Sequence, residues 1–499
     1  MSEVAPLTAR NIGWLRYLHR KATTTDNWER QGHPHEHWDN LSEAPMLCYH
    51  RFDLIDSTYA VALMADRTPA WREVYEQILD ELIFRHTGWW AAEDWLTQIG
   101  DDPKRANYPE EFRPLIPAAH WGSYNVPGWT ANGIEPWGLQ WDPIGADGNL
   151  FFKGFFLVML GLHRRVTGNA RWDAPFDIVR DGEHTYTWWH TKIAEHLAAQ
   201  WRARPEGCHC ENTKIWPYCL AGAGFGLQLA DLAFGTDHHG AFDIWWDHAR
   251  REYLHLDSDD PPTMVTFYYD PIIDEHLELP AAVGGAIPVI YLAPQVPEEA
   301  RKLWDIARAQ MGLLHITGPV PVIGPRFTAL ALLLARNWGV TDLTDALQAA
   351  CDENYPPTWN RERGEVTWDF GLGEPHPRGQ YNATLAAADA MTEGGWWRLG
   401  NVSSAARFDE PTVSGVDFPT VALTRAEWNG RGRRLHLTLD AMNESVHGQS
   451  TSMLITGLAD PAAFGASSPD GGRVEAEVRG SDLLIKTEIG KHSLLISQD

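Results

Sequence analysis

Three of the five cysteines lie within one short segment, residues 207–219, whose side chains could carry out chemistry most directly. A thiol can donate a proton, accept one as thiolate, or attack carbon as a nucleophile. Cys219 stands where a helical pattern begins, and a helix N-terminus would stabilise its thiolate. From spacing alone, Cys210 and Cys219 fit equally well as a catalytic pair or, with Cys208, as buried apolar side chains.

The same segment could also supply thiolate ligands to zinc, but its spacing argues against such a site. Cys208, His209 and Cys210 are adjacent, whereas zinc ligands are usually separated by about two to four residues, and no second ligand pair follows. Alternating histidines at residues 33–37 could bind a divalent cation, but they are more typical of a solvated N-terminal loop. The sequence therefore predicts no metal and no other cofactor.

These side chains must be positioned by helices, because helical periodicity dominates roughly the first 400 residues. About a dozen helix candidates are joined by long Trp-, Gly- and Pro-rich loops, above all residues 121–148, without strand–helix alternation. The pattern favours an all-α toroid around a central cavity, with 25 Trp residues to build its core and line that cavity. Alternation at residues 434–439, 473–478 and 483–487 predicts a small antiparallel sheet. We therefore expect a catalytic domain at 1–400 and a β-rich region packed on it at 401–499.

Composition excludes several classes of partner. The 41 basic and 67 acidic residues give a net charge of −26, which argues against nucleic acid or an anionic membrane as the main partner. No run is long and apolar enough to span a bilayer, and no export signal is visible, so the sequence predicts a cytoplasmic protein. Five cysteines in such a chain do not indicate a disulfide framework.

Three groups of residues, taken in order along the chain, resemble the linalool dehydratase-isomerase family. One is the acid–phenol pair six residues apart, another is a helix led by Asn149, and the third is the cysteine segment with an aromatic between its thiols. The residues that carry the resemblance are Asp53 and Tyr59; Asn149, Gly154 and the Met-Leu-Gly-Leu run at 159–162; and Cys210, Glu211, Trp216 and Cys219 with the Gly-rich helix after them.

The resemblance implies an (α/α)6 barrel, in a cyclic homo-oligomer. Enzymes of this family remove water from small alkenols, add water to them, or isomerise them, without a metal or organic cofactor. By position, Cys210 and Cys219 correspond to the paired catalytic cysteines. Asp53 and Tyr59 correspond to an Asp–Tyr pair that reaches the site from a neighbouring subunit. The expected substrate is a small apolar alcohol or alkene, terpenoid-like, and the expected partner is a further copy of this chain.

The residue types suit this reaction. A tertiary or allylic alcohol loses its oxygen slowly unless that oxygen is protonated as the bond breaks, so a positioned acid is required. Aromatic faces can stabilise developing allylic cation character and exclude water. The substrate-binding residues predicted on these grounds and by position are Phe151, Phe155, Trp216, Lys153 and Glu211.

The sequence also departs from the family pattern at its site. Phe155 stands where the family has an alcohol-binding His, and Lys153 where it has a small Ser. The family's Cys-Glu-Pro and Cys-Asn are replaced by Cys-Glu-Asn at 210–212 and Cys-Leu at 219–220. These changes remove a hydroxyl-binding group and make one wall of the site more aromatic.

Two other functions remain open on the sequence. Toroids rich in Trp and acidic residues can bind and cleave sugars with two carboxylates, for which Glu93, Asp94 and Asp142 are candidates. A non-catalytic protein that holds a terpenoid or lipid-like ligand would also fit the aromatic composition. A ligand returned unchanged after long incubation would distinguish such a binding protein from an enzyme.

Overall fold

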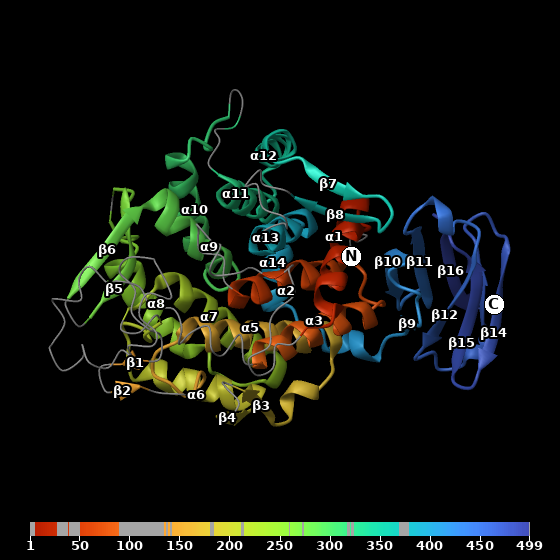
Figure 1. Ribbon diagram of the computed structural model, residues 1–499, viewed down its shortest axis with the longest axis horizontal. Helices are drawn as coiled ribbons and strands as arrows, with labels where there is room; N and C mark the ends of the chain where they lie inside the picture. The colour runs from red at the N-terminus through yellow and green to blue at the C-terminus, as the bar shows by residue number, and fades with distance from the viewer. Residues whose placement is uncertain are drawn as a thin grey trace.

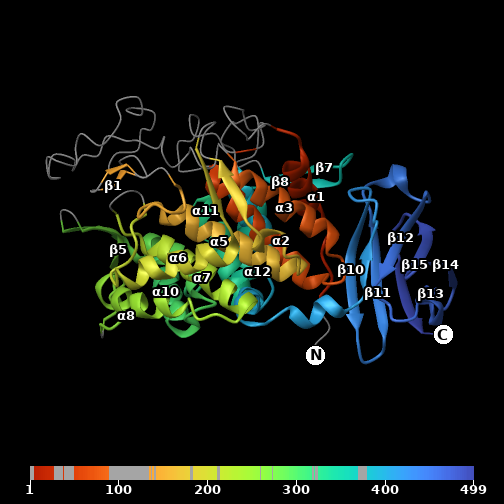
Figure 2. The ribbon, with the colours of Figure 1, turned by 90° about the horizontal axis from the view of Figure 1, so that it is seen from below.

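The computed structural model describes residues 5–26, 38, 50–88, 134–135, 138–139, 142–179, 184–210, 214–258, 260–271, 274–316, 320, 324–368 and 379–498. Within these residues a helical region and a large sheet lie side by side, with the sheet at one end of the molecule (Figures 1 and 2). The helical region holds the cysteine segment and the helix that carries Asp53 and Tyr59. This region therefore positions the residues of the candidate site.

Six helices make up the centre of the helical region, and each packs against the next. In chain order the contacts run from α2 to α5, α7, α9, α11 and α13, and α13 returns to α2. The bounds are α2 (His50–Arg67), α5 (Leu150–Thr167), α7 (Pro217–Phe234), α9 (Ala286–Leu292), α11 (Pro325–Asn337) and α13 (Gly379–Ala390).

The remaining helices of the described chain pack mostly on the outside of these six (Figure 1). None of the helices in the described ranges is both long enough and apolar enough to cross a membrane. The bounds are α1 (Ala9–Thr23), α3 (Glu73–Thr87), α6 (His190–Arg202), α8 (Gly240–Glu252), α10 (Pro297–Gln310), α12 (Thr341–Asn354) and α14 (Gly395–Asn401).

Glycines allow α5 and α7 to approach closely. A Cβ added at Gly154 of α5 would lie 2.7 Å from the Cβ of Ala223 on α7. A Cβ added at Gly222 of α7 would lie 2.0 Å from the ring of Phe155 on α5. Since real Cβ atoms do not come so near to other atoms, these positions require glycine, and the Phe155 ring packs closely against Gly222 of α7.

Four two-stranded antiparallel hairpins lie within the described part of the helical region. The hairpin β5–β6 carries a register shift between Thr266 and Tyr268, and Ile215 bridges to Tyr269 on β5, which ties the cysteine segment to this hairpin. The bounds are β1 (Ile134–Glu135), β2 (Gly138–Leu139), β3 (Phe176–Val179), β4 (Thr185–Trp188), β5 (Met264–Asp270), β6 (Glu275–Pro280), β7 (Pro357–Asn360) and β8 (Glu365–Trp368).

The large sheet has eight strands, every neighbouring pair antiparallel, in the order β10-β11-β16-β13-β14-β15-β12-β9. Backbone hydrogen bonds tie it to the loop before α3, because Ala70 N–H donates to Ala426 O at 3.1 Å and Val413 N–H donates to Ala70 O at 2.8 Å. The bounds are β9 (Thr412–Ser414), β10 (Val421–Asn429), β11 (Arg434–Ala441), β12 (Ser450–Thr456), β13 (Phe464–Ser467), β14 (Arg473–Arg479), β15 (Asp482–Glu488) and β16 (Ser493–Gln498).

The predicted fold class, an all-α (α/α)6 barrel with a small β appendage, is wrong. The β structure is a large eight-stranded sheet together with four hairpins. Alternation identified the strands near 434–439, 473–478 and 483–487, but β9 and β13 are too short to show a period. The sheet also pairs strands that are far apart in sequence, such as β11 with β16, and such pairings leave no local pattern.

Candidate active site

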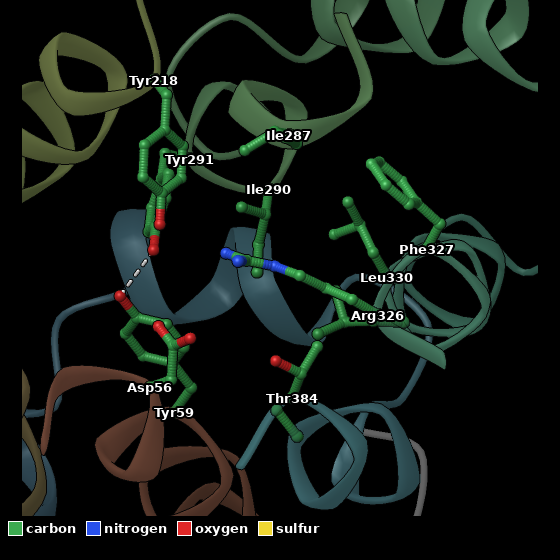
Figure 3. A pocket seen from close by; sticks show the side chains of 12 residues that line it. Asp56, Tyr59, Tyr218, Ile287, Ile290, Tyr291, Arg326, Phe327, Leu330 and Thr384 are labelled. Carbon is green, nitrogen blue, oxygen red and sulfur yellow. Dashed lines mark hydrogen bonds between the residues drawn. The ribbon is translucent and has the colours of Figure 1, made fainter. Parts of the chain in front are cut away.

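Helix α2 carries two acidic residues and a tyrosine at intervals of three: Asp53, Asp56 and Tyr59. Each residue of an α-helix advances by about 100°, so Asp56 and Tyr59 lie about 60° apart on one face, and Asp53 lies about 120° from Tyr59. Figure 3 shows the Asp56 and Tyr59 side chains together at the edge of a pocket. The helix therefore presents Asp56 beside the tyrosine, although the resemblance pointed to Asp53.

Asp53 is fully buried and forms an ion pair with Lys21 of α1, which is also buried. The Ser57 hydroxyl donates to Asp53 Oδ1 at 3.4 Å. The backbone of Gly379, at the start of α13, lies directly on the carboxylate, since a Cβ there would come within 1.9 Å of Asp53 Oδ2. Asp53 of α2 therefore contacts α1 through this ion pair and α13 through the Gly379 backbone.

Tyr59 is a buried phenol whose hydroxyl lies 2.7 Å from the hydroxyl of Tyr291 on α9. Its ring packs edge-on against Trp396, with 5.2 Å between centroids. Burial first, and then the negative charge of Asp56, raise the pKa of Tyr59 well above its usual value. Tyr59 is therefore a protonated phenol at neutral pH, able to donate a hydrogen bond.

Two further tyrosines complete an aromatic cluster around Tyr59. Tyr218 of α7 and Tyr291 of α9 have centroids 5.5 Å apart, and Phe155 of α5 lies 5.4 Å from each of them. Burial also raises the pKa of Tyr218 and of Tyr291, so both phenols are protonated. Phe155 thus packs against the phenols where a hydroxyl-binding His was expected.

A pocket that encloses about 470 Å³, part of it open to solvent, lies among five of the central helices (Figure 3). The phenols and Asp56 form one side, and apolar side chains of α9 and α11 form the other. The lining residues among those described are Asp56, Tyr59, Tyr218, Ile287, Ile290, Tyr291, Arg326, Phe327, Leu330, Leu333, Thr384 and Ala387.

The pocket holds groups of opposite charge. Asp56 is 6% exposed and accepts a hydrogen bond from Gln380 Nε2 of α13 at 3.0 Å. Arg326, in the first turn of α11, extends its guanidinium across the pocket toward the side that carries the phenols (Figure 3). Both charges act on Tyr218, because Asp56 raises the pKa of that phenol and Arg326 lowers it.

The three cysteines of residues 207–219 are buried in the core. Cys219 is buried in the first turn of α7, directly after Tyr218, so the helix start predicted near it is confirmed. Cys210 is also buried, and its carbonyl accepts from Asn149 N–H at 2.7 Å, which ties the segment to the start of α5. Burial raises the pKa of Cys208 to about 12, so this thiol stays protonated.

The other residues predicted to bind substrate are distributed along α5 and the cysteine segment. Lys153 is fully buried rather than pointing to water, and donates to the Ala146 carbonyl and to Gln200 Oε1, the latter at 2.7 Å. Phe151 packs near Phe52, with 6.1 Å between centroids.

Trp216 packs against Phe267 and Tyr268 of β5, with both centroid separations 4.9 Å. Glu211 lies outside the described residues. Of the predicted residues, Tyr59 lines the pocket, Phe155 contacts the phenols Tyr218 and Tyr291, and Cys219 directly follows Tyr218 in sequence.

Of the carboxylates predicted as candidates for sugar cleavage, Asp142 lies within the described residues. Asp142 accepts from Trp188 Nε1 at 3.1 Å and from Ile144 N–H at 2.9 Å, so its carboxylate holds local structure together. Among the residues that the structure describes, no group of three or more His, Cys, Asp or Glu side chains could hold a metal ion. The candidates that lie outside the described ranges are Glu93, Asp94, His33, His35 and His37.

The polar residues that line the pocket but were not predicted from the sequence are Asp56, Tyr218, Tyr291, Arg326 and Thr384. Helical spacing could have found Asp56, because it shares a face with Tyr59. Tyr218 directly precedes Cys219 and could have been suspected from that position. The other three come from helices far away in sequence, and only the packing of those helices brings them to the pocket.

The fold and site define a class of protein with a helical region whose central helices enclose an aromatic pocket bearing phenols and a carboxylate. The family model described as linalool dehydratase/isomerase matches residues 120–366. The chain belongs to the linalool dehydratase/isomerase family, a family of enzymes acting on alkenols. The matched residues include the cysteine segment, Tyr291 and Arg326, whereas Asp56 and Tyr59 precede them.

Solved structures similar to this chain include endoglucanase CelQ from Clostridium thermocellum. Its complex with cellobiose and cellotriose is matched at 10% identity with a TM-score of 0.38. Its complex with cellotetraose is matched at 11% identity with a TM-score of 0.39. Both matches cover 99% of this chain and 93% of the CelQ chain.

Proposed function

We propose that this chain is a cofactor-independent hydro-lyase that removes water from small tertiary or allylic alkenols, adds it, or isomerises them. The observation that carries the proposal is Tyr59, a buried, protonated phenol that faces a largely apolar pocket in a chain of the linalool dehydratase/isomerase family. An apolar pocket with few polar groups suits a small alkenol, because the polar groups fix the hydroxyl and the apolar wall holds the hydrocarbon.

In the proposed reaction, Tyr59 donates its proton to the substrate hydroxyl as the C–O bond breaks. The leaving hydroxide is basic enough to take a proton from a phenol of raised pKa, since bulk water has a pKa of about 15.7. Asp56 accepts a proton from the carbon next to the cationic centre and returns it to the phenolate. Water and an alkene leave, and both side chains regain their starting protonation states.

The aromatic cluster supplies the surroundings that this reaction needs. The rings of Tyr218 and Tyr291, which line the pocket, stabilise positive charge on an allylic carbon, and Phe155 packs against both rings. Cys210 and Cys219 are proposed as the family's paired catalytic cysteines. Tyr59 contacts Tyr291 within one chain, so a single subunit already supplies α2 to the pocket. A cyclic homo-oligomer remains a prediction for the assembly.

The test is headspace gas chromatography of the purified protein with alkenols from methylbutenols to linalool. Diene formation is expected, with a loss of roughly 100-fold or more in Tyr59→Phe, because a positioned acid typically contributes at least that much. Cys210→Ala and Cys219→Ala are measured alongside.

Tyr75→Phe is the matched control, because Tyr75 is a buried tyrosine of α3 that bonds to Thr68 away from the pocket. Its activity should match that of the unaltered protein. Full activity in Tyr59→Phe would remove Tyr59 from the mechanism, and no turnover of any alkenol would contradict the proposed function.

A further inference from the structure

A second pocket of the helical region is lined by arginines and shares no lining residue with the phenol pocket. It encloses about 310 Å³, part of it open to solvent, where the C-terminal ends of α2 and α5 meet the chain that leads to the large sheet. Arg72, Arg165 and Arg407 line it together with Asp66. Arg407 comes from the short 3₁₀ helix η7 (Ala405–Asp409). We call this space the arginine pocket.

One carboxylate is shared by three cations at this pocket. Asp66 forms ion pairs with Arg165 at 3.7 Å, with Arg398 of α14 at 3.4 Å and with Arg407 at 2.8 Å. Burial has the largest effect on Arg165, and together with the charges of Arg407 and Arg398 it lowers the pKa of that guanidinium to about 10, while Asp66 opposes them. The cations are therefore charged at neutral pH and repel one another.

Other carboxylates near the arginine pocket lie around Arg72. Burial lowers the pKa of Arg72, and the charges of Glu410, Asp409 and Glu76 raise it. Glu410 also lies near Arg407, whose charge lowers the pKa of Glu410, although burial raises that pKa overall. None of these three acidic residues belongs to the lining, so Asp66 is the one carboxylate among the described residues that line the pocket.

The guanidinium groups retain donors for a ligand. Each guanidinium carries five N–H donors. Within the described residues, the Arg407 guanidinium donates through Nη1 to Asp66 Oδ1 at 2.8 Å. The Arg165 guanidinium donates through Nη1 to the carbonyl of Val402. Further N–H groups of both side chains can therefore donate to an anion in the arginine pocket.

A neighbouring pocket extends the arginine pocket in an apolar direction. It encloses about 500 Å³, also partly open to solvent, and the two spaces share Arg165 and Phe408 in their linings. Its wall on α7 is apolar and consists of Leu229, Leu232 and Ala233. A ligand that occupies both spaces would have an anionic end at the arginines and a hydrocarbon end against α7.

We propose that these two pockets bind a phosphate monoester with a short hydrocarbon chain, with the phosphate in the arginine pocket and the chain against α7. This site is separate from the alkenol site and does not depend on the proposed reaction. A carboxylate matches the planar fork of one guanidinium, whereas a phosphate offers acceptor oxygens in several directions to arginines from different segments of the chain. A phosphate monoester also carries about −1.5 to −2 charges at neutral pH, which offsets cations that share a single Asp66.

The first experiment is isothermal titration calorimetry of the purified protein with monobutyl phosphate and with inorganic phosphate at constant ionic strength. We expect saturable binding of butyl phosphate and weaker binding of inorganic phosphate, which has no chain to place against α7. Arg407→Gln should weaken butyl phosphate binding by about 10- to 100-fold, the range for hydrogen bonds to charged groups. Arg407 is half-buried at the pocket, so this variant should fold.

Arg431→Gln is the matched control, because Arg431 is an exposed arginine in the turn between β10 and β11. It should bind butyl phosphate as the unaltered protein does. No saturable binding of butyl phosphate, or equal binding by the unaltered protein and Arg407→Gln, would overturn the site. Inorganic phosphate that binds as tightly as butyl phosphate would overturn the role of the α7 wall.

Further variants change the charge on the wall without removing an arginine. Asp66→Asn removes the acidic lining residue, so butyl phosphate should bind more tightly. Ala233 is exposed in the second pocket, and Ala233→Glu should bind butyl phosphate more weakly than Ala233→Gln, which has the same size and no charge. An ion network that takes no ligand would show neither change. Equal affinities in the two Ala233 variants, with no gain in Asp66→Asn, would overturn the placement of the phosphate.

Discussion

Asp53 and Asp56 stand three residues apart on α2, yet the structure gives them opposite surroundings. Asp53 is sealed between helices with Lys21 as its counter-charge and the Gly379 backbone against it. Asp56 opens on the pocket beside Tyr59 and raises the pKa of three phenols. The difference teaches that the neighbouring helices decide the surroundings of a carboxylate on α2. Asp53 is buried against other helices, whereas Asp56 lines the pocket.

The largest expected effect is on activity at Asp56. Asp56→Asn should lower kcat/KM for alkenol dehydration by about 100- to 10,000-fold, the usual contribution of a general base, while the urea unfolding midpoint changes little. Asp53→Asn should instead lower the urea unfolding midpoint, with little change in the kcat/KM of the folded protein. If Asp53→Asn loses activity at unchanged stability, and Asp56→Asn does not, the assignment of roles in this comparison is reversed.

The second effect is on stability at Lys21. Lys21→Met leaves the Asp53 charge buried without its cation, and removing one partner of a buried pair typically costs about 3–5 kcal/mol. Urea denaturation followed by circular dichroism measures the change. Lys491→Met, at a surface turn of the sheet, is the control. An unfolding free energy within about 0.5 kcal/mol of the unaltered protein would show that the pair contributes nothing net.

The third effect sharpens the packing around Asp53. Gly379→Ala would put a Cβ 1.9 Å from Asp53 Oδ2, so the carboxylate or α13 must move, at a cost of about 1–3 kcal/mol. Gly430→Ala is the control, because its nearest contact would be an ordinary 3.7 Å to Trp428 Nε1. Thermal unfolding of the two variants gives the comparison, and equal melting temperatures would show that Asp53 accommodates the methyl group freely.

The last effect arises only at high pH and concerns a buried group that is held neutral, in contrast to the charged Asp53. Burial raises the pKa of Cys208 from 9.0 to about 12, despite the opposing charge of Lys153. A raised pKa in the folded state stabilises the protein below pH 9 and loses that contribution as the pH rises toward 12. Between these values the loss is at most about 1.4 kcal/mol per pH unit.

Cys208→Ala should therefore show a shallower loss of stability than the unaltered protein between pH 9 and 11, measured by urea unfolding at each pH. The buried tyrosines give both proteins a common decline, so the difference between the two curves isolates the thiol. Curves that stay parallel over this range would contradict the shift.

The local pattern of the sequence was sufficient for much of the helical region. Pro217 lies in the first turn of α7 and Gly235 directly follows its last residue, and α5 ends at Thr167 with Gly168 in the left-handed conformation. These signals are local, because proline fits the first turn of a helix and glycine accepts a positive φ at its end. The family also followed from short motifs, which the match over residues 120–366 confirms.

The fold class did not follow, since strand order in the eight-stranded sheet depends on contacts between distant segments. The same limit applies to Lys153, because its position in a helical pattern does not show that it is buried and bonded to Gln200 of α6. Neither the strand order nor the burial of Lys153 can be recognised from the hydrophobic periodicity of the segments concerned.

The sequence by itself determined which residue types are present, where most helices begin and end, and which family the cysteine segment belongs to. Helical spacing already puts Asp56 on the same face as Tyr59, but only the tertiary structure decided that this face lines a pocket together with Tyr291 and Arg326. The reason is physical: helix ends depend on interactions within a few residues, whereas a pocket depends on which faces of distant helices pack together.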